Sequence, residues 1–424
     1  MGKEAPLISM RNGKDDCILN ATGIIVEYNP FHNGHLHHLE MTKELTGADV
    51  TVAVMSGYFL QRGEPALLGK WERAGMALHA GVDLVIELPY SFATQHSSVF
   101  AKGAVCLLDS VGCSSFCFGS EDGNIETFEG TANTLQKRQT EYNAAIRKYS
   151  REGLSYPAAL SKAFLSLGLK EPFIDLSKPN NILGFHYIQA RDEIDSGMKA
   201  YTVTRKAADY HDEHFASPSI ASATSIRKAL FGDGDPGEIR SLLPPESMRA
   251  LKAYEDTYGS LHRWEDYWPL LQYKILSTPI DQLRRIYEIE EGIEHRIVEC
   301  ASRSSSFTEC MNRLKSKRYT WTRLQRMLLH ILMNVSKEEM NARSGRPSYI
   351  RLLAMSASGR EYLREHKKEI SLPLISKLSS ADPVEAALDI RAANMFSMGL
   401  KGMGARMESM KKEWSTPPLQ LQKS

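Results

Sequence analysis

Residues 24–35 read Ile24-Ile25-Val26-Glu27-Tyr28-Asn29-Pro30-Phe31-His32-Asn33-Gly34-His35. The apolar, β-branched start predicts a strand, Pro30 lies in the loop that follows, and His-x-Gly-His opens a helix. This spacing puts His32 and His35 one turn apart on one helix face, at the positive end of the helix dipole. Gly34 lets a ligand come close to the main chain. The motif indicates a site for a nucleoside triphosphate whose α-phosphate is attacked.

The motif by itself leaves two other interpretations of the histidines open. Pairs at this spacing also occur on ordinary surface helix turns and in metal sites. His37 and His38 add two further imidazoles, and imidazole is a common zinc ligand. Because no carboxylate or cysteine stands nearby at ligand spacing, we predict no metal site here.

The composition is that of an ordinary globular protein. The 424 residues are 42% apolar and 24% charged, and a formal net charge of +1 means that any basic surface must be local. No window approaches the roughly 18 apolar residues of a membrane span, and the polar N-terminus lacks the apolar core of a secretory signal. Six scattered cysteines without a Cys-x-x-Cys pair suit a reducing compartment. We therefore expect a cytoplasmic protein with no membrane association.

Residues 22–206 alternate between strand-like and helix-like segments. The predicted strands are 22–28, 49–56, 83–88, 114–118 and 199–203, and the predicted helices are 35–45, 70–80, 97–111, 126–150 and 179–194. This alternation predicts an α/β, Rossmann-like parallel sheet with helices on both faces. Ligands bind such sheets beyond the carboxyl ends of the strands, which is where His-x-Gly-His is expected.

After about residue 240 the strand pattern ends. The predicted helices there are 242–256, 268–278, 279–303, 321–334 and 359–366. Turn residues at 232–237 and the prolines at 244 and 245 mark the boundary. We therefore expect a flexible extension (1–17), an α/β domain (18–238), a mostly α-helical domain (239–412) and a flexible tail (413–424).

A second motif follows the last predicted strand and reads Ser222-Ala223-Thr224-Ser225-Ile226-Arg227. The hydroxyls of Ser222 and Thr224, the free N–H groups of a helix N-terminus and the Arg227 guanidinium together would form a phosphate-binding site. An ordinary helix N-cap beside a surface arginine is the alternative. Combined with His-x-Gly-His, the motif predicts that one element holds the adenosine and α-phosphate while the other holds the leaving pyrophosphate.

The two motifs together resemble those of nucleotidyltransferases with a HIGH-type signature. Further segments are similar to the bacterial tRNA(Met) cytidine acetate ligase family, and they are 23–38, 55–57, 61–65, 80–89, 118–121, 179–184, 204–211, 319–332, 347–353 and 389–392. The resemblance covers nearly the whole chain. It implies that the α/β domain is a HIGH-type nucleotidyltransferase domain and that the helical domain binds tRNA.

The resemblance also implies the reaction. Acetate would attack the α-phosphorus of ATP to give acetyl-adenylate and pyrophosphate. The N4 atom of the wobble cytidine of elongator tRNA(Met) would then attack the acetyl carbon and release AMP. Mg²⁺ is expected to arrive with ATP, since no dedicated carboxylate cage is visible in the sequence.

The family's ATP-binding residues carry over onto a defined set of positions. They are Ile25, Val26, Glu27, Tyr28, Asn29, Pro30, Phe31, His32, Asn33, Gly34, His35, Leu36, His37, His38, Gly119, Asn180, Arg205 and Lys206. We expect His32 and His35 to be the catalytic pair, acting by positioning and charge neutralisation. The simpler alternatives are a turn glycine at 119, a helix cap at 180 and a solvated basic pair at 205–206.

Residues 313–326 hold six basic residues, no acidic one and two aromatics. The expected tRNA contacts in this segment are Lys315, Lys317, Arg318, Tyr319, Trp321 and Arg323. The aromatics could stack an unpaired base while the cations follow the phosphates. A solvated helix face is the alternative.

Two other functions remain possible from the sequence. One is a different adenylyl-transferring carboxylate ligase of the same fold. The other is a non-catalytic RNA-binding module with a residual nucleotide site, although the presence of both motifs argues against it. The sequence does not predict the oligomeric state.

Overall fold

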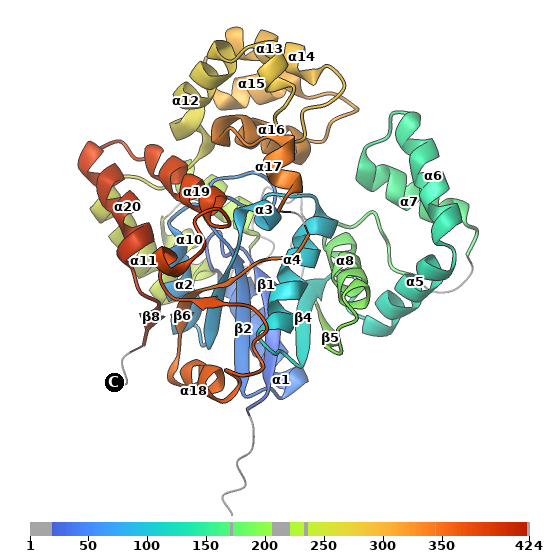
Figure 1. Ribbon diagram of the computed structural model, residues 1–424, viewed down its shortest axis with the longest axis vertical. Helices are drawn as coiled ribbons and strands as arrows, with labels where there is room; N and C mark the ends of the chain where they lie inside the picture. Colours follow the sequence, from blue (N-terminus) through green and yellow to red (C-terminus); the bar gives the residue numbers. More distant parts are fainter. Residues whose placement is uncertain (1–18, 170–172, 206–220, 233–235, 344, 422–424) are drawn as a thin grey trace, which may run out of the picture.

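The computed structural model describes residues 19–169, 173–205, 221–232, 236–343 and 345–421, so the expected extension at 1–17 lies outside the described residues. A single eight-stranded sheet forms its centre (Figure 1). The strands are β1 (Ala21–Val26), β2 (Val50–Ser56), β3 (Leu84–Leu88), β4 (Ser115–Ser120), β5 (Lys199–Thr204), β6 (Ile350–Met355), β7 (Leu374–Ile375) and β8 (Leu419–Gln420).

Strands β1 to β5 are parallel and lie in the order β5-β4-β1-β2-β3, which confirms the predicted α/β sheet. Ile24 of β1 pairs with Ala53 on one side and Cys117 on the other. Every residue of β2 and β3 is buried, because helices cover both faces. The chain passes from β1 to β2 and β3, then returns to β4 beside β1. This reversal of direction at the carboxyl end of β1 is where such sheets bind ligands.

The helices of the first half follow the predicted alternation, but two of them are not predicted from the sequence and one predicted helix is divided. They are α1 (Asn33–Thr46), α2 (Lys70–His79), α3 (Tyr90–Ala93), α4 (Ser97–Ser110), α5 (Ile125–Lys137), α6 (Gln139–Arg151), α7 (Tyr156–Ser166) and α8 (Pro179–Glu193). The two that the sequence does not predict are α3 and α7. The single helix predicted at 126–150 is two helices, α5 and α6, which meet at Arg138. The guanidinium of Arg138 donates to the carbonyl of Leu167 at 3.0 Å, which ties the break to the end of α7.

The second half is mostly helical, as predicted. Its helices are α9 (Ala223–Phe231), α10 (Pro236–Leu242), α11 (Pro245–Tyr258), α12 (Trp264–Ser277), α13 (Ile280–Leu283), α14 (Ile293–Ser302), α15 (Phe307–Leu314), α16 (Trp321–Met333), α17 (Lys337–Asn341), α18 (Ala357–Glu365), the 3-10 turn η1 (Leu378–Ser380), α19 (Ala387–Met398) and α20 (Met403–Ser415). The helix predicted at 279–303 is interrupted and forms α13 and α14. None of the described helices has the length and apolar character to cross a bilayer.

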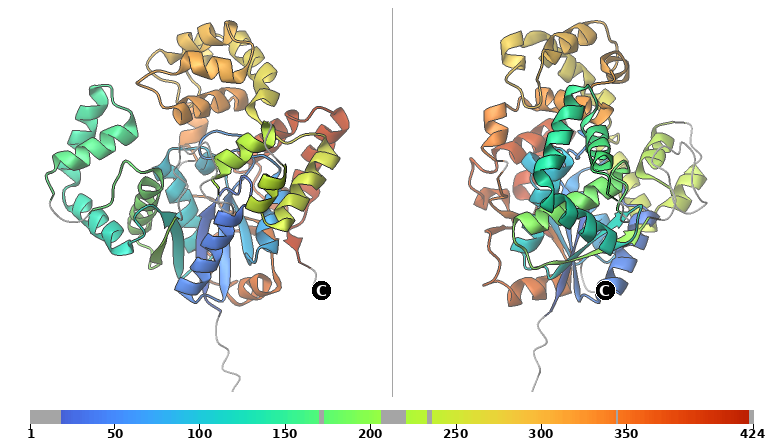
Figure 2. Two further views of the ribbon diagram at one scale, coloured as in Figure 1. Left: turned by 180° about the vertical axis from the view of Figure 1, so that it is seen from behind. Right: turned by 90° about the vertical axis from the view of Figure 1, so that its right-hand side faces the viewer.

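Helices α12 to α17 share an apolar core with α19, α3 and the loop after β2, and in it Trp264 stacks on Phe307 with ring centroids 4.4 Å apart. They lie above the carboxyl ends of the parallel strands, while α5 to α7 project from the β5 side of the sheet (Figures 1 and 2). The carboxyl edge of the sheet is therefore flanked by two separate helical groups.

The end of the chain returns to the sheet, which corrects the expected domain boundaries. Strand β6 pairs antiparallel with β3 and parallel with β8, so the sheet does not end at residue 238. The described part of the expected flexible tail is ordered, and Glu413 is 1% exposed. Its carboxylate forms an ion pair with Lys70 of α2 at 2.8 Å. This buried ion pair fixes the tail, because a charge removed from water needs its partner.

Candidate active site

The loop after β1 positions the two histidines of the candidate site. Residues 27–32 connect β1 to α1, with Tyr28 at φ 50° and a cis peptide between Asn29 and Pro30. The Asn29 side chain is buried, and its Oδ1 accepts from the backbone N–H of Leu67 at 2.7 Å. Phe31 is fully buried beside the Tyr28 ring, at 4.7 Å between centroids. Packing and backbone hydrogen bonds thus hold the loop that presents the histidines.

His32 and His35 form a reciprocal cap at the start of α1. The Nδ1 atom of His32 accepts from the N–H of Gly34 at 3.0 Å, and Nδ1 of His35 accepts from the N–H of His32 at 3.3 Å. The ring centroids lie 3.8 Å apart. Because each Nδ1 is an acceptor, each neutral ring carries its proton on Nε2. Both Nε2–H groups are then available to donate to a ligand.

The environment keeps these imidazoles uncharged. Burial, with smaller contributions from the charges of Arg205 and Arg227, lowers the pKa of His32 to about 3. Burial and then the neighbouring His32 lower the pKa of His35 well below its usual value, and burial lowers that of His38 to about 4. At neutral pH the histidines therefore act as hydrogen-bond donors, while the positive charge near them comes from arginines. The described residues contain no group of three or more His, Cys, Asp or Glu side chains arranged to hold a metal.

The second motif contacts the first. Ser222 caps α9 by accepting from the N–H of Ser225 at 3.1 Å, as the helix-cap interpretation predicted. Arg227 donates from Nη1 to the Asn29 carbonyl at 3.0 Å and from Nη2 to Glu64 at 2.8 Å. Thr224 lies in the first turn and is partly exposed. The arginine thus joins α9 to the loop that carries His-x-Gly-His.

The remaining predicted ATP contacts lie at the ends of β4 and β5. Arg205 follows β5, and its N–H bonds the Ser120 carbonyl at 2.9 Å. A Cβ placed on Gly119 would lie 3.3 Å from Cγ of Arg205, so the glycine leaves room for this side chain. The Asn180 side chain donates to Glu121 at 2.7 Å. Glu121 in turn accepts from the first N–H groups of α8, while Lys206 lies outside the described residues.

Sequence reasoning missed Arg73, which supports the carboxyl edge of the sheet. Arg73 is fully buried, and its guanidinium donates to the carbonyls of Glu27, Ser56 and Gly57. The Glu27 carboxylate accepts from the N–H of Gln61 at 2.8 Å, and burial raises the pKa of Glu27. Arg73 gives no signal in the sequence, because it lies in an ordinary amphipathic helix and its partners are backbone atoms.

Most of the predicted tRNA contacts lie at the surface, and Tyr319 is the exception. Tyr319 is 5% exposed and its hydroxyl donates to Glu291, so its ring is not presented to solvent. Arg318 forms an ion pair with the same Glu291, and Arg323 pairs with Glu290 at 3.2 Å. Four of the predicted contacts are exposed, and they are Lys315, Lys317, Arg318 and Trp321, whereas Arg323 is half-buried.

Comparison with known proteins places this site in a class. The family model described as HIGH Nucleotidyl Transferase matches residues 19–411, and the chain belongs to that family. Its relatives carry a more specific name. The tRNA(Met) cytidine acetate ligase of Lysinibacillus sphaericus is 47% identical over 403 residues, covering 95% of this chain and 100% of the relative. That of Bacillus subtilis is 46% identical over 387 residues, covering 90% and 93%.

Two solved structures are similar over most of the chain. The crystal structure of apo Thermotoga maritima TmcAL has a TM-score of 0.89 at 33% identity, covering 96% of this chain and 100% of that one. The structure of the same protein bound with alpha-thio ATP has a TM-score of 0.87 with the same identity and coverage. The resemblance noted in the sequence is therefore confirmed at the level of family and fold.

Proposed function

We propose that this chain is an ATP-dependent ligase that attaches acetate to N4 of the wobble cytidine of elongator tRNA(Met). The observation that supports it most is the contact of Arg227 with Asn29 and Glu64, which brings the two phosphate-binding motifs together beyond the end of β1. The relatives named above, at 46–47% identity, carry the name of this activity. Its substrates ATP, acetate and tRNA are those of the cytoplasm, which is the proposed location.

The first step would activate acetate. An acetate oxygen forms a bond to the α-phosphorus of ATP, the bond from phosphorus to the bridging oxygen breaks, and pyrophosphate leaves. The Nε2–H groups of His32 and His35 would donate to the α-phosphate oxygens as charge gathers there. Arg227, with the N-terminus of α9, would bind the leaving pyrophosphate. Arg205 supplies further positive charge at the same edge.

The second step would transfer the acetyl group. The cytidine N4 attacks the acetyl carbon, the bond to the AMP oxygen breaks, and N4 loses a proton. Mg²⁺ would enter with ATP, held mainly by phosphate oxygens and water, because such ions keep most of their waters and need few protein ligands. It would supply charge neutralisation on the triphosphate.

The deciding experiment is nucleoside mass analysis of unmodified bacterial tRNA after incubation with the protein, ATP and acetate. Parallel reactions lack acetate or contain His35→Ala. We expect N4-acetylcytidine only in the complete reaction with the unaltered protein. Acetate-driven AMP formation without acetylcytidine would indicate a different carboxylate ligase of this fold. Neither product would indicate a non-catalytic RNA-binding module.

A further inference from the structure

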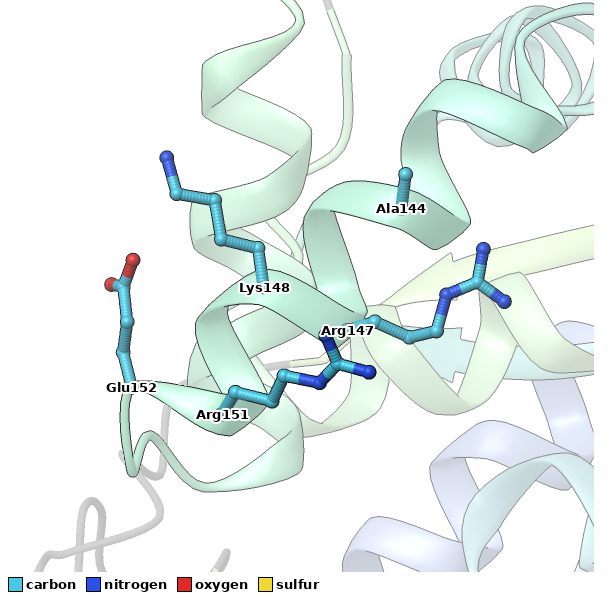
Figure 3. Close-up of a pocket in the computed structure, with 5 residues that line it drawn as sticks. All are labelled: Ala144, Arg147, Lys148, Arg151 and Glu152. Carbon is cyan, nitrogen blue, oxygen red and sulfur yellow. The ribbon is translucent and has the colours of Figure 1, made fainter.

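The α5–α7 group carries a concentration of positive charge that the proposed chemistry does not use. Between residues 137 and 162 the chain has six basic side chains and two acidic ones. Three of the basic residues, Arg147, Lys148 and Arg151, are exposed on α6. With Ala144 and Glu152 they line a surface hollow of about 500 Å³ (Figure 3). The excess of cations is thus gathered in the last turns of one helix.

These three cations have no carboxylate within ion-pairing distance among the described residues. The carboxylate of Glu152, the acidic residue that lines the hollow, lies instead near Lys162, with Oε2 and Nζ 3.7 Å apart. Figure 3 shows the guanidinium groups of Arg147 and Arg151 extending to the same side of α6. Like charges four residues apart on a helix repel each other and destabilise it. This arrangement therefore costs the free protein stability, and a bound anion would remove that cost.

The predicted tRNA segment differs in this respect. Four of its six basic residues form ion pairs with glutamates, and the pairs are Arg313–Glu309, Arg318–Glu291, Arg323–Glu290 and Arg326–Glu288. A paired cation contributes little to the field that attracts a polyanion. Among the described residues, three cations without a carboxylate partner lie on α6, whereas two, Lys315 and Lys317, lie at 313–326, although the sequence signal is richer there.

The position of α6 fits a long ligand. Helices α6 and α7 stand beside the carboxyl edge of the sheet on the β5 side, whereas α12 to α16 lie above the carboxyl ends of the strands (Figures 1 and 2). An RNA whose modified base enters at that edge would extend past one or both helical groups. A mononucleotide bound at the end of β1 would not need contacts with the second group.

We propose that the Arg147–Lys148–Arg151 face of α6 binds the phosphodiester backbone of the RNA substrate, away from the nucleotide that is modified. This inference rests on the proposed function, because it takes the substrate to be a tRNA. Binding there is by charge and so carries no base specificity. It holds the tRNA against the enzyme while the base is positioned elsewhere.

The test compares two triple variants of the full-length protein. The first is Arg147→Gln with Lys148→Gln and Arg151→Gln. The matched control is Arg360→Gln with Lys367→Gln and Lys368→Gln, which removes three exposed cations in and after α18, at the other end of the sheet. The measurements are the Kd for unmodified tRNA(Met) at several salt concentrations and acetate-dependent ATP–pyrophosphate exchange without RNA.

We expect the α6 variant to bind tRNA at least about tenfold more weakly near 0.1 M salt. The slope of log K against log salt should become about 2 units less negative, since each lost phosphate contact contributes roughly 0.7–0.9. Pyrophosphate exchange should not change, and the control should behave as the unaltered protein. A variant that acetylates tRNA and binds it with unchanged Kd and slope contradicts this inference alone. If the unaltered protein binds no tRNA, both this inference and the proposed function are contradicted.

Discussion

At the carboxyl edge of the sheet, Arg227 and Glu64 form an ion pair, in which Nη2 of the arginine and Oε2 of the glutamate are 2.8 Å apart. The two residues are 163 positions apart in the chain. The same guanidinium also donates to the Asn29 carbonyl. The arginine that we propose to bind phosphate is therefore positioned by the histidine loop and by the loop after β2.

We expect Arg227→Lys to raise KM for ATP about tenfold or more in pyrophosphate exchange. A lysine ammonium cannot reproduce the planar fork that contacts Asn29 and Glu64 together, and hydrogen bonds to charged groups contribute about 1.5–3 kcal/mol. Glu64→Gln, which keeps an acceptor for Arg227, should have a smaller effect. Equal KM values for Arg227→Lys and the unaltered protein would show that the arginine does not contact ATP.

His32→Asn should lower kcat for acetate activation by about 100-fold or more, as the loss of one donor to a developing charge typically does. Asparagine is a good N-cap, so α1 should remain folded, which thermal unfolding can check. A change confined to KM would place His32 in ground-state binding instead.

The depressed pKa of His32, about 3, also predicts how activity depends on pH. The folded enzyme keeps this ring neutral down to about pH 4, so exchange activity should show no inflection near pH 6.5 from this group. The unfolded chain does take up the proton near pH 6.5. Folding stability is therefore lost as the pH falls from 6.5 towards 3. Rates at pH 5.5 and 7.5, measured well below the unfolding temperature, separate the two effects.

Glu413→Ala should destabilise the protein by about 3–5 kcal/mol, the usual cost of removing one partner of a buried ion pair. The change leaves Lys70 with Glu87 alone, and the neighbouring Arg351 loses its nearby carboxylate. Glu408→Ala, an exposed glutamate on the same helix, is the control and should change stability by less than about 0.5 kcal/mol. Similar unfolding free energies for the two variants would mean that the buried pair does not hold the tail.

Gly63→Ala should damage both stability and activation. Gly63 has φ +77°, and a Cβ there would lie 2.7 Å from the backbone nitrogen of Arg326 in α16. The left-handed conformation alone costs a non-glycine residue about 1–2 kcal/mol, and the clash would also move the loop that carries Glu64. Gly130→Ala in α5 has open space and should instead stabilise the helix by up to about 1 kcal/mol. Unchanged activity in Gly63→Ala would separate this loop from the site.

The chain sequence by itself determined the parallel sheet and the place of the histidines. Local hydrophobic patterns are enough to predict strands β1 to β5, and the place of His-x-Gly-His after a strand is enough to predict that a helix begins there. These features depend on neighbouring residues, so a single sequence carries them. The caps made by His32 and Ser222 are local in the same sense.

Only the tertiary structure decided which distant groups meet. Lys70 and Glu413 pair across 343 positions, and β6 joins the sheet beside β3, so neither a flexible tail nor a separate helical domain describes the end of the chain. Tyr319 reads as a surface aromatic in a basic segment, yet packing buries it. Four of the six cations at 313–326 pair with glutamates from 288 to 291 and at 309, whereas Arg147, Lys148 and Arg151 of α6 have no carboxylate partner among the described residues. Such pairings depend on how helices and strands pack together, and a pattern of neighbours along the chain does not contain that information.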